Sequence, residues 1–299
     1  MPYDRSTMFP TLLAIPCLWL STTEFSPDAP AEDRPSEVFE LDFTATAWFP
    51  RLTGTFAIGP NGTTLDVETD TFLHGSEVAF NGELDLRVGA WTFHVAGSEF
   101  STNGNGVLEE SAQVGGVDLA AGSLWSSSYD QWTIEAEADL AIWRPFADEP
   151  FPWSPPGQRS GNQNADQDYL VDLRINGRLG YRFTHVRQTF DSPTGGLRSI
   201  STADWSAIVL GVIVDVGIDT RPLIPFIREL EFEAGATASP VIAGGSGYLF
   251  GIEATLRAYI IENAALVFGF RLQGTNATAG EYERNGSVMG LVAGATIRF

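Results

Sequence analysis

Three histidines, His74, His94 and His185, are the side chains of this sequence best suited to acid–base catalysis. A catalytic partner on the same face of a strand stands two residues away, and at His94 that position holds Ala96, which offers no chemistry. We therefore expect each histidine to be a loop or rim residue. No catalytic residues are expected, and the chain is predicted not to be an enzyme.

Motifs for metals and cofactors are equally sparse. Cys17 is the only cysteine, so neither a disulfide nor a paired-cysteine metal site can form within the chain. Asp66, Glu68 and Asp70 alternate and could offer carboxylate oxygens to Ca²⁺, but their spacing lacks the calcium-loop pattern. The glycine-rich stretches 103–106 and 244–247 fit exposed turns better than a phosphate-binding loop. We expect neither a metal nor a cofactor.

The charge of the chain excludes one class of partner. The 299 residues carry a net charge of −21, and all 17 basic residues are arginine. Nucleic-acid binding depends on clustered basic residues that neutralise phosphates. We therefore expect no nucleic-acid partner. The 43% of hydrophobic residues are enough for a folded domain with a large buried surface.

The N-terminal region predicts export. Arg5 precedes an apolar run, Phe9–Leu20, that is long enough for a signal-peptide core and too short to span a bilayer as a helix. We interpret residues 1–21 as a signal peptide, with no clear cleavage site. Residues 22–37 are rich in proline and acidic residues and are predicted to be a disordered linker. Residues 38–299 are predicted to be the folded domain, which the pattern described below indicates to be an outer-membrane β-barrel.

From residue 38 onward the chain alternates apolar and polar residues in segments bounded by turn residues, which is the pattern of two-faced β-strands. Every charged residue of the eight clearest segments lies on the polar face. Two further segments, Trp91–Ser101 and Trp205–Asp219, alternate more weakly, which gives about ten strands. The eight clear segments are Val38–Phe49, Glu77–Val88, Trp132–Trp143, Leu170–Phe183, Glu229–Ser239, Leu249–Ile260, Ala264–Gly274 and Met289–Phe299.

Alternation alone does not decide which face meets solvent, because a soluble β-sandwich turns its apolar face inward and a membrane barrel turns it outward. The segments are long enough to cross a bilayer at a tilt. A soluble domain of this size would expose many lysines, and this sequence contains none. Aromatic residues also gather at segment ends, as an interfacial girdle requires. These aromatic residues are Trp48, Phe49, Trp91, Trp132, Trp143 and Trp205.

Loop lengths also favour a membrane barrel over a soluble β-sandwich. A periplasmic N-terminus places the short connections 89–90, 220–225 and 261–263 on one side and the longer gaps 102–131, 184–204 and 275–288 on the other. The gap 50–76 is predicted to contain a small hairpin, Thr53–Glu68, that turns at Pro60-Asn61-Gly62. The long segment 144–169 falls on the short side, so eight or twelve strands stay open. We predict an all-β fold, an antiparallel transmembrane β-barrel of about ten strands.

The C-terminal residues resemble the signal by which outer-membrane proteins of Gram-negative bacteria are recognised for barrel insertion. The chain ends in Phe299, with Ile297 on the same face of the last segment. This resemblance implies the barrel-assembly machinery as a partner and the bacterial outer membrane as the location.

A second resemblance covers about residues 39–100. Trp48-Phe49-Pro50 before Gly54-Thr55, and Arg87-Val88-Gly89-Ala90-Trp91, are similar to motifs of a family of uncharacterised bacterial outer-membrane β-barrel proteins. Members share a first strand that ends in a Trp-Leu-Pro-like turn before Gly-Thr, and a later hairpin with Arg-x-Gly-x-Trp. The resemblance implies fold and location, and no chemistry.

If the polar faces point inward, charged residues line the lumen. The first hypothesis is structural: arginine–carboxylate ladders brace a narrow barrel. The second is a porin-like water-filled pore whose excess of acids favours small cations. The expected lumen charges are Glu83, Asp85, Glu135, Glu137, Asp139, Arg174, Arg178, Arg182, Glu229, Glu231, Glu233, Glu253, Arg257, Arg271 and Arg298.

The expected function is therefore a structural outer-membrane barrel or a small cation-preferring channel. Its expected partners are outer-membrane lipid, the barrel-assembly machinery and possible small cations. Two alternatives remain: an outer-membrane barrel enzyme that acts on lipid or peptide, and a soluble secreted β-sandwich that binds a ligand.

Overall fold

The computed structural model describes residues 39–73, 75, 77–145, 171–192, 196–220, 224, 226–261 and 263–299. The expected signal peptide and linker, His74 and nearly all of the segment 144–169 lie outside the described residues. Within the described ranges no helix has the length and apolar character to cross a membrane.

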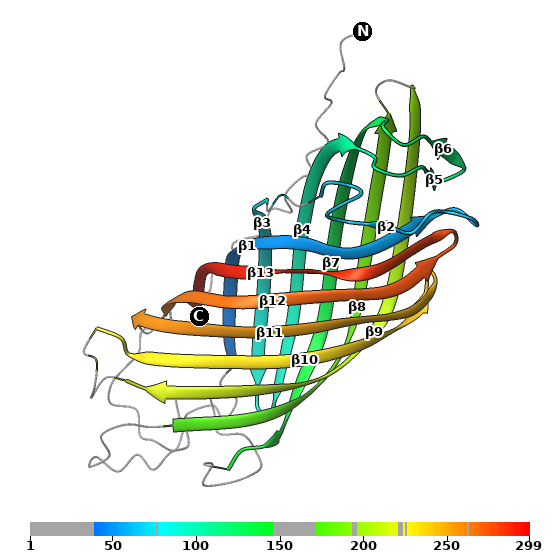
Figure 1. Cartoon of the computed structure of the whole chain (residues 1–299). Coiled ribbons are helices and arrows are strands. Elements are labelled where there is room, and N and C mark those ends of the chain that lie inside the picture. The colour runs from blue at the N-terminus through cyan, green and yellow to red at the C-terminus, as the bar shows by residue number, and fades with distance from the viewer. Residues whose placement is uncertain are drawn as a thin grey trace, which may run out of the picture. The chain divides into compact units, whose positions relative to one another are not determined.

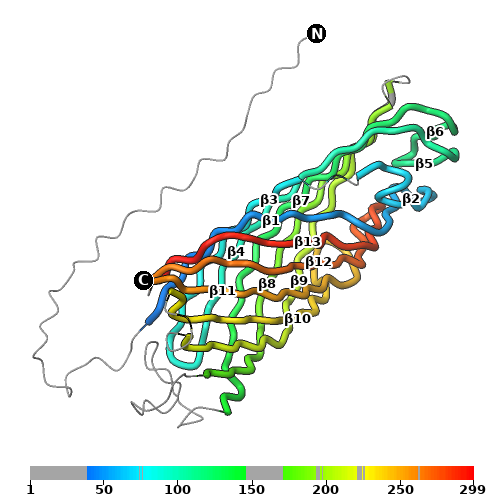
Figure 2. Tube along the Cα trace, turned by 60° about the vertical axis from the view of Figure 1, so that its left-hand side comes forward, coloured from blue at the N-terminus to red at the C-terminus, as the bar shows by residue number. Residues whose placement is uncertain are grey.

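Ten antiparallel strands form one closed barrel (Figures 1 and 2), because β13 pairs with β1 and so joins the two edges of the sheet. This confirms the predicted fold class, resolves the strand number, and excludes the soluble β-sandwich. The barrel strands are β1 (Phe39–Ile58), β3 (Ala79–Val88), β4 (Trp91–Val107), β7 (Leu124–Trp143), β8 (Val171–Ser192), β9 (Leu197–Asp219), β10 (Glu229–Ala243), β11 (Ser246–Ile261), β12 (Ala264–Ala279) and β13 (Tyr282–Arg298).

The barrel has two unlike ends. We call the end with Phe39, Phe299 and the two-residue turn Gly89-Ala90 the terminal end, and the opposite one the extended end. β8 and β9 have 22 and 23 residues, about twice the roughly 9–11 that a tilted strand needs to cross a bilayer. Figure 1 shows β4, β7, β8 and β9 running on past β3 and β10, so the extra length projects at the extended end.

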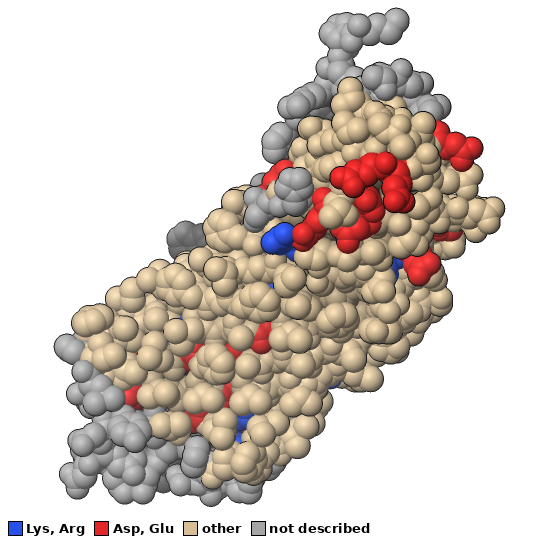
Figure 3. All heavy atoms as spheres, viewed as in Figure 1, with Lys and Arg blue, Asp and Glu red and all other residues tan. Residues whose placement is uncertain are grey.

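In the half of the barrel near the terminal end, apolar side chains point outward and polar side chains point inward. Leu179 on β8 is 59% exposed, whereas its neighbours Arg178 and Arg182 are buried. Figure 3 shows a surface that is largely free of charge over this half, with acidic side chains gathered towards the extended end. An apolar band around a polar lumen is the arrangement of barrels that face lipid.

In the extended half the arrangement reverses. On β7 Trp125 and Tyr129 point inward and are buried, while Ser126 and Asp130 lie on the outer face. The inward side chains form a hydrophobic core, as in a soluble β-protein. Its large members include Trp48, Leu52, Phe56, Leu65, Val67, Leu73, Phe100, Leu108, Trp125, Tyr129, Val186, Phe190, Trp205, Leu249, Tyr282 and Val288.

This reversal corrects three expectations. The gaps 184–204 and 275–288 are mostly strand, which reduces the connections to 193–196 and 280–281, because strands continue where the apolar face changes sides. The stretch 103–106 belongs to β4 and is not a turn. Trp48 and Trp205 are 1% and 0% exposed and lie in the core, so they do not belong to an interfacial girdle.

A segment between β1 and β3 closes over the core. The predicted hairpin is confirmed: β1 turns after Ile58, and β2 (Leu65–Asp66) pairs back on Phe56 and Thr55. Leu73 is fully buried, and the Ser127 hydroxyl donates a hydrogen bond to the carbonyl oxygen of Thr71. These contacts fix the segment against the inner wall. A small two-stranded sheet, β5 (Ala112–Val114) and β6 (Val117–Leu119), lies in the connection from β4 to β7.

Candidate functional site

The polar lumen near the terminal end is the strongest candidate site, because it gathers all fifteen side chains expected to line it. Fourteen of them lie within 4.0 Å of an oppositely charged arginine or carboxylate, whereas Asp85, among the described residues, contacts only His94. The reason is local: strict alternation places every second side chain of each strand inward, and neighbouring strands bring acids beside arginines.

The ladder between β7 and β8 shows this most directly. Asp139 pairs in register with Arg178, and Glu135 with Arg182. Arg178 donates to both oxygens of Asp139, at 2.7 and 2.9 Å, while Arg182 Nε lies 2.7 Å from Glu135. Glu137 contacts Arg178 at 2.9 Å. The two bonds between Arg178 and Asp139 are charge-assisted hydrogen bonds, which are strong in a buried site, and the other two contacts are ion pairs.

Other contacts cross the lumen. Arg178 on β8 donates to Glu253 on β11 at 3.2 Å, and Arg271 on β12 lies 4.0 Å from Glu83 on β3. Gln131 on β7 donates to Gln273 on β12 at 3.4 Å. Strands that are not sheet neighbours therefore touch through their side chains, so the interior of this half is filled.

At the terminal end one arginine ties the first strand to two others. Arg298 contacts Asp42 at 3.1 Å and Glu231 at 3.2 Å, and its guanidinium lies over the Tyr259 ring, 4.3 Å from the centroid. Arg87 donates to Glu40 at 2.7 Å. Sequence reasoning placed Glu40, Asp42 and Arg87 on polar faces but did not count them as site residues.

A pair of arginines brackets one carboxylate beside this group. Arg144 Nε lies 2.9 Å from Asp172, and Arg174 Nε lies 3.1 Å from its other oxygen. All three side chains are buried. Glu233 and Arg257, 2.8 Å apart, complete the network on β10 and β11.

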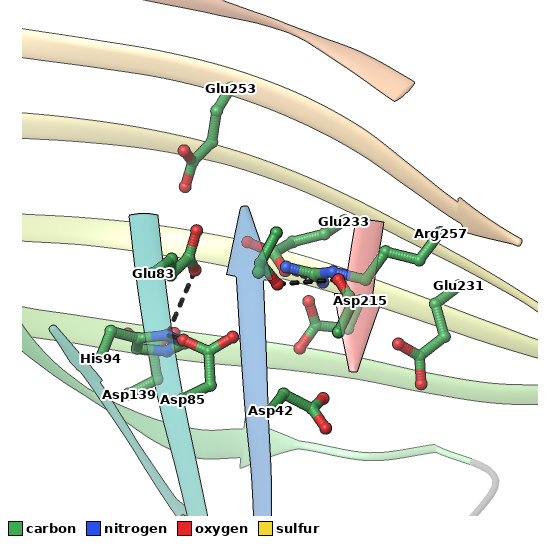
Figure 4. A network of polar contacts seen from close by, with 12 residues as sticks. Asp42, Glu83, Asp85, His94, Asp139, Asp215, Glu231, Glu233, Glu253 and Arg257 are labelled. Atoms are coloured by element: carbon green, nitrogen blue, oxygen red, sulfur yellow. Dashed lines mark hydrogen bonds and ion pairs between the residues drawn. The ribbon is translucent and has the colours of Figure 1, made fainter. Parts of the chain in front are cut away.

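The placement of His94 corrects the prediction of a rim residue. Its ring lies inside the barrel, with Nδ1 2.6 Å from Asp85 Oδ1 and Nε2 2.9 Å from Asp139 Oδ2 (Figure 4). Glu83 Oε1 is 3.8 Å from Nδ1. The partners come from β3 and β7, whereas the sequence analysis considered only positions two residues away on the strand of His94. Glu83, Asp85 and His94 are spaced closely enough to hold a metal ion.

The other candidates from the sequence have structural roles. His185 lies on the outer face of β8, 2.6 Å from Asp204 and stacked on Trp132. Asp66 accepts hydrogen bonds from the backbone N–H groups of Glu68 and Thr69, both at 2.9 Å, and so stabilises a turn. The three acids considered for Ca²⁺ do not alternate along one strand, since β2 ends at Asp66.

One cavity of the lumen lies among the charged groups of this half, and it is small. Its volume is about 20 Å³, room for about one water molecule. Glu135, Arg182, Glu253 and Arg271 contribute to its lining. Above it, towards the extended end, the hydrophobic core fills the interior.

Comparison with known proteins adds distant likenesses of shape. No family model and no curated protein matches the chain. Among solved structures, Ail of Yersinia pestis, crystallised with the heparin analogue sucrose octasulfate, shares 12% identity over 87% of this chain and 99% of its own, with a TM-score of 0.32. Neisserial surface protein A shares 12% over 89% of this chain and 100% of its own, with a TM-score of 0.32. The outer-membrane protease OmpT of Escherichia coli shares 8% over 90% and 100%, with a TM-score of 0.35.

These likenesses are too distant to transfer an activity or a ligand, and the fold of this chain stands on its own strand pairing. What the site can do chemically follows from its contacts. The charged groups brace the wall by mutual pairing, and one cluster, around His94, offers ligands to a cation.

Proposed function

We propose that this chain is a bacterial outer-membrane barrel with a sealed lumen, which serves as a structural anchor and not as an open channel. The outward apolar band supports residence in a membrane, because such a surface is stable only against lipid. The resemblance of the C-terminal residues to a barrel-insertion signal supports the outer membrane, with its lipid and its assembly machinery as partners.

The observation that carries the sealed lumen is the change of interior along the barrel axis. A conducting pore needs a continuous polar, water-filled path. Here paired charges from opposite walls fill one half, and large apolar side chains such as Trp48, Trp205 and Phe190 fill the other. Many of the acids that would favour cations in an open lumen are held instead in ion pairs with arginine.

The extended half is the part of the protein that would project from the membrane. β8 and β9 carry a folded, acidic structure beyond the apolar band, and its core supports it without lipid. We further propose that the protein is not an enzyme. Both ring nitrogens of His94 already contact carboxylates inside the barrel, which leaves neither free to act on an external substrate.

Planar-bilayer recording of the purified full chain tests the sealed lumen. We expect no stable conductance steps in KCl, while the same preparation shows heat-modifiable migration in a gel, as a folded barrel does. Steps with cation selectivity would contradict the sealed lumen and favour the channel. A chain that stays soluble without detergent would contradict the membrane anchor altogether.

A further inference from the structure

We propose that Glu83, Asp85 and His94 form a binding site for one divalent transition-metal ion of the Zn²⁺ class inside the barrel. The three ligand atoms lie within 4.8 Å of one another. Ligands on a tetrahedral metal at about 2.0–2.1 Å are roughly 3.3 Å apart. The distances from His94 Nδ1 to Asp85 and to Glu83, 2.6 and 3.8 Å, fall on either side of that value, so small movements would complete the site.

The second nitrogen of the ring is already arranged as in known metal sites. A metal-bound histidine usually donates its other N–H to a carboxylate, which fixes the tautomer and the orientation of the ring. Here Nε2 contacts Asp139 Oδ2 at 2.9 Å, and Arg178 holds both oxygens of Asp139. When the ion binds, Nε2 keeps its proton towards Asp139, and Nδ1 releases to solvent the proton that it shares with Asp85, so that its lone pair is directed at the ion.

The local charge also calls for a cation. Among the described residues no arginine lies within 4.0 Å of Asp85, and Arg271 is the one arginine within 4.0 Å of Glu83, at 4.0 Å. Arg271 is closer to Glu253, at 3.4 Å, and Arg257 is paired with Glu233 at 2.8 Å.

Glu83 is the least satisfied member of the cluster. Its side chain is 16% exposed, and its nearest charged partners among the described residues are His94 Nδ1 at 3.8 Å and Arg271 Nη2 at 4.0 Å. A protonated His94 would satisfy Asp85 and Asp139 and still leave Glu83 without a close partner. A divalent ion would neutralise Glu83 and Asp85 together, because buried charges are stable only when they are paired or coordinate a metal.

The ligand types indicate which ion. One imidazole and two carboxylates suit Zn²⁺ and its neighbours in the transition series, whereas Mg²⁺ prefers six oxygen ligands and retains its waters. The sequence analysis expected no metal because the chain has no paired cysteines and no metal-binding histidine set. Glu83 and Asp85 lie on one strand and His94 on the next, so only the strand pairing brings them together.

Zinc content of the refolded full chain tests the proposal. The chain is refolded in detergent with Zn²⁺ present, freed of unbound metal by gel filtration and analysed by inductively coupled plasma mass spectrometry. We expect about one Zn²⁺ per folded chain, and X-ray absorption showing one nitrogen and at least two oxygen ligands. An equal concentration of Mg²⁺ should not compete.

Three variants locate the ion. Glu83→Gln and His94→Asn are expected to lower zinc affinity at least tenfold, whereas His185→Asn, which removes a histidine from the outer face, should leave it unchanged. Glu83→Gln removes a poorly paired charge, so this variant is expected to fold, and heat-modifiable migration checks each one. Wild-type chain without zinc, or Glu83→Gln with full zinc content, would overturn the site. Either result would leave the conductance test of the sealed lumen unaffected.

Discussion

Arg178 of β8 donates hydrogen bonds to both carboxylate oxygens of Asp139 on the neighbouring strand β7, at 2.7 and 2.9 Å. The same guanidinium contacts Glu137 and, across the lumen, Glu253. One arginine thus joins three strands. Because Arg178 and Asp139 are both buried, removing either side chain would leave the other as an unpaired charge inside the barrel, which destabilises the fold.

Removing this arginine should destabilise the barrel strongly. In Arg178→Ala, Asp139 and Glu137 lose their closest arginine, and breaking a buried pair in this way costs about 3–5 kcal/mol. Urea unfolding in detergent, followed by tryptophan fluorescence, measures the change. The matched control is Arg51→Ala: Arg51 pairs with Glu68 at 2.8 Å, but its side chain is 56% exposed, so we expect a change of about 0–1 kcal/mol. Equal losses in the two variants would mean that the lumen pairs are solvated.

The limits of the apolar band can be tested on the outer face. Leu179 lies within the band and Ile200 lies on the outer face of β9 in the extended half, and both are exposed. Leu179→Arg should cost about 2–4 kcal/mol in a lipid bilayer, because it places a charge against hydrocarbon. Ile200→Arg should be tolerated, since this position meets water. Unfolding from lipid vesicles gives both values, and similar costs would show that the band is misplaced.

Much of this fold follows from alternation, and its gaps have a physical cause. Charges on one face identified eight strands because lumen and lipid demand opposite side chains. β9 alternates weakly because both of its faces are apolar. Its inward positions Ala207, Val209 and Ile213 are buried, and its outward apolar positions are exposed. In the extended half the apolar face changes sides, so the pattern breaks although the strand continues. The predicted strands were therefore too short at the extended end.

The site was predictable in part. Inward charges follow from parity alone, but their partners follow from register. The turn Gly89-Ala90 pairs Val88 with Trp91, and counting back from it pairs Asp85 with His94. That signal was present in the sequence, whereas the contact of His94 with Asp139, 45 residues away, depends on the pairing of β4 with β7. Closure across the lumen depends on the barrel as a whole.

Close packing of the segment before β3 makes a third prediction. A Cβ atom added at Gly104 would overlap the carbonyl oxygen of Phe72, which belongs to the backbone and cannot move aside freely. Gly104→Ala should therefore cost about 1–3 kcal/mol. Gly97→Ala on the same strand is the control, because the nearest atom to its Cβ would be 3.9 Å away. Urea unfolding compares the two, and a neutral Gly104→Ala would show that the segment is not fixed inside the barrel.

The last residue allows assembly to be separated from stability. The backbone N–H of Phe299 donates to Leu41 at 2.9 Å, and Leu41 donates back at 3.3 Å, so the residue extends the seam that closes the barrel. Its side chain is 66% exposed and contributes little to packing. Phe299→Ala keeps the seam and removes the ring, whereas deletion of Phe299 removes both.

If the ring is read by the assembly machinery, both variants should reach the outer membrane in reduced amounts, while Phe299→Ala refolds in detergent as well as the parent chain. Immunoblots of membrane fractions and gel migration after refolding give the two readouts. Normal abundance of Phe299→Ala beside a depleted deletion variant would assign the effect to the two backbone hydrogen bonds. The aromatic side chain would then not be an insertion signal in this protein.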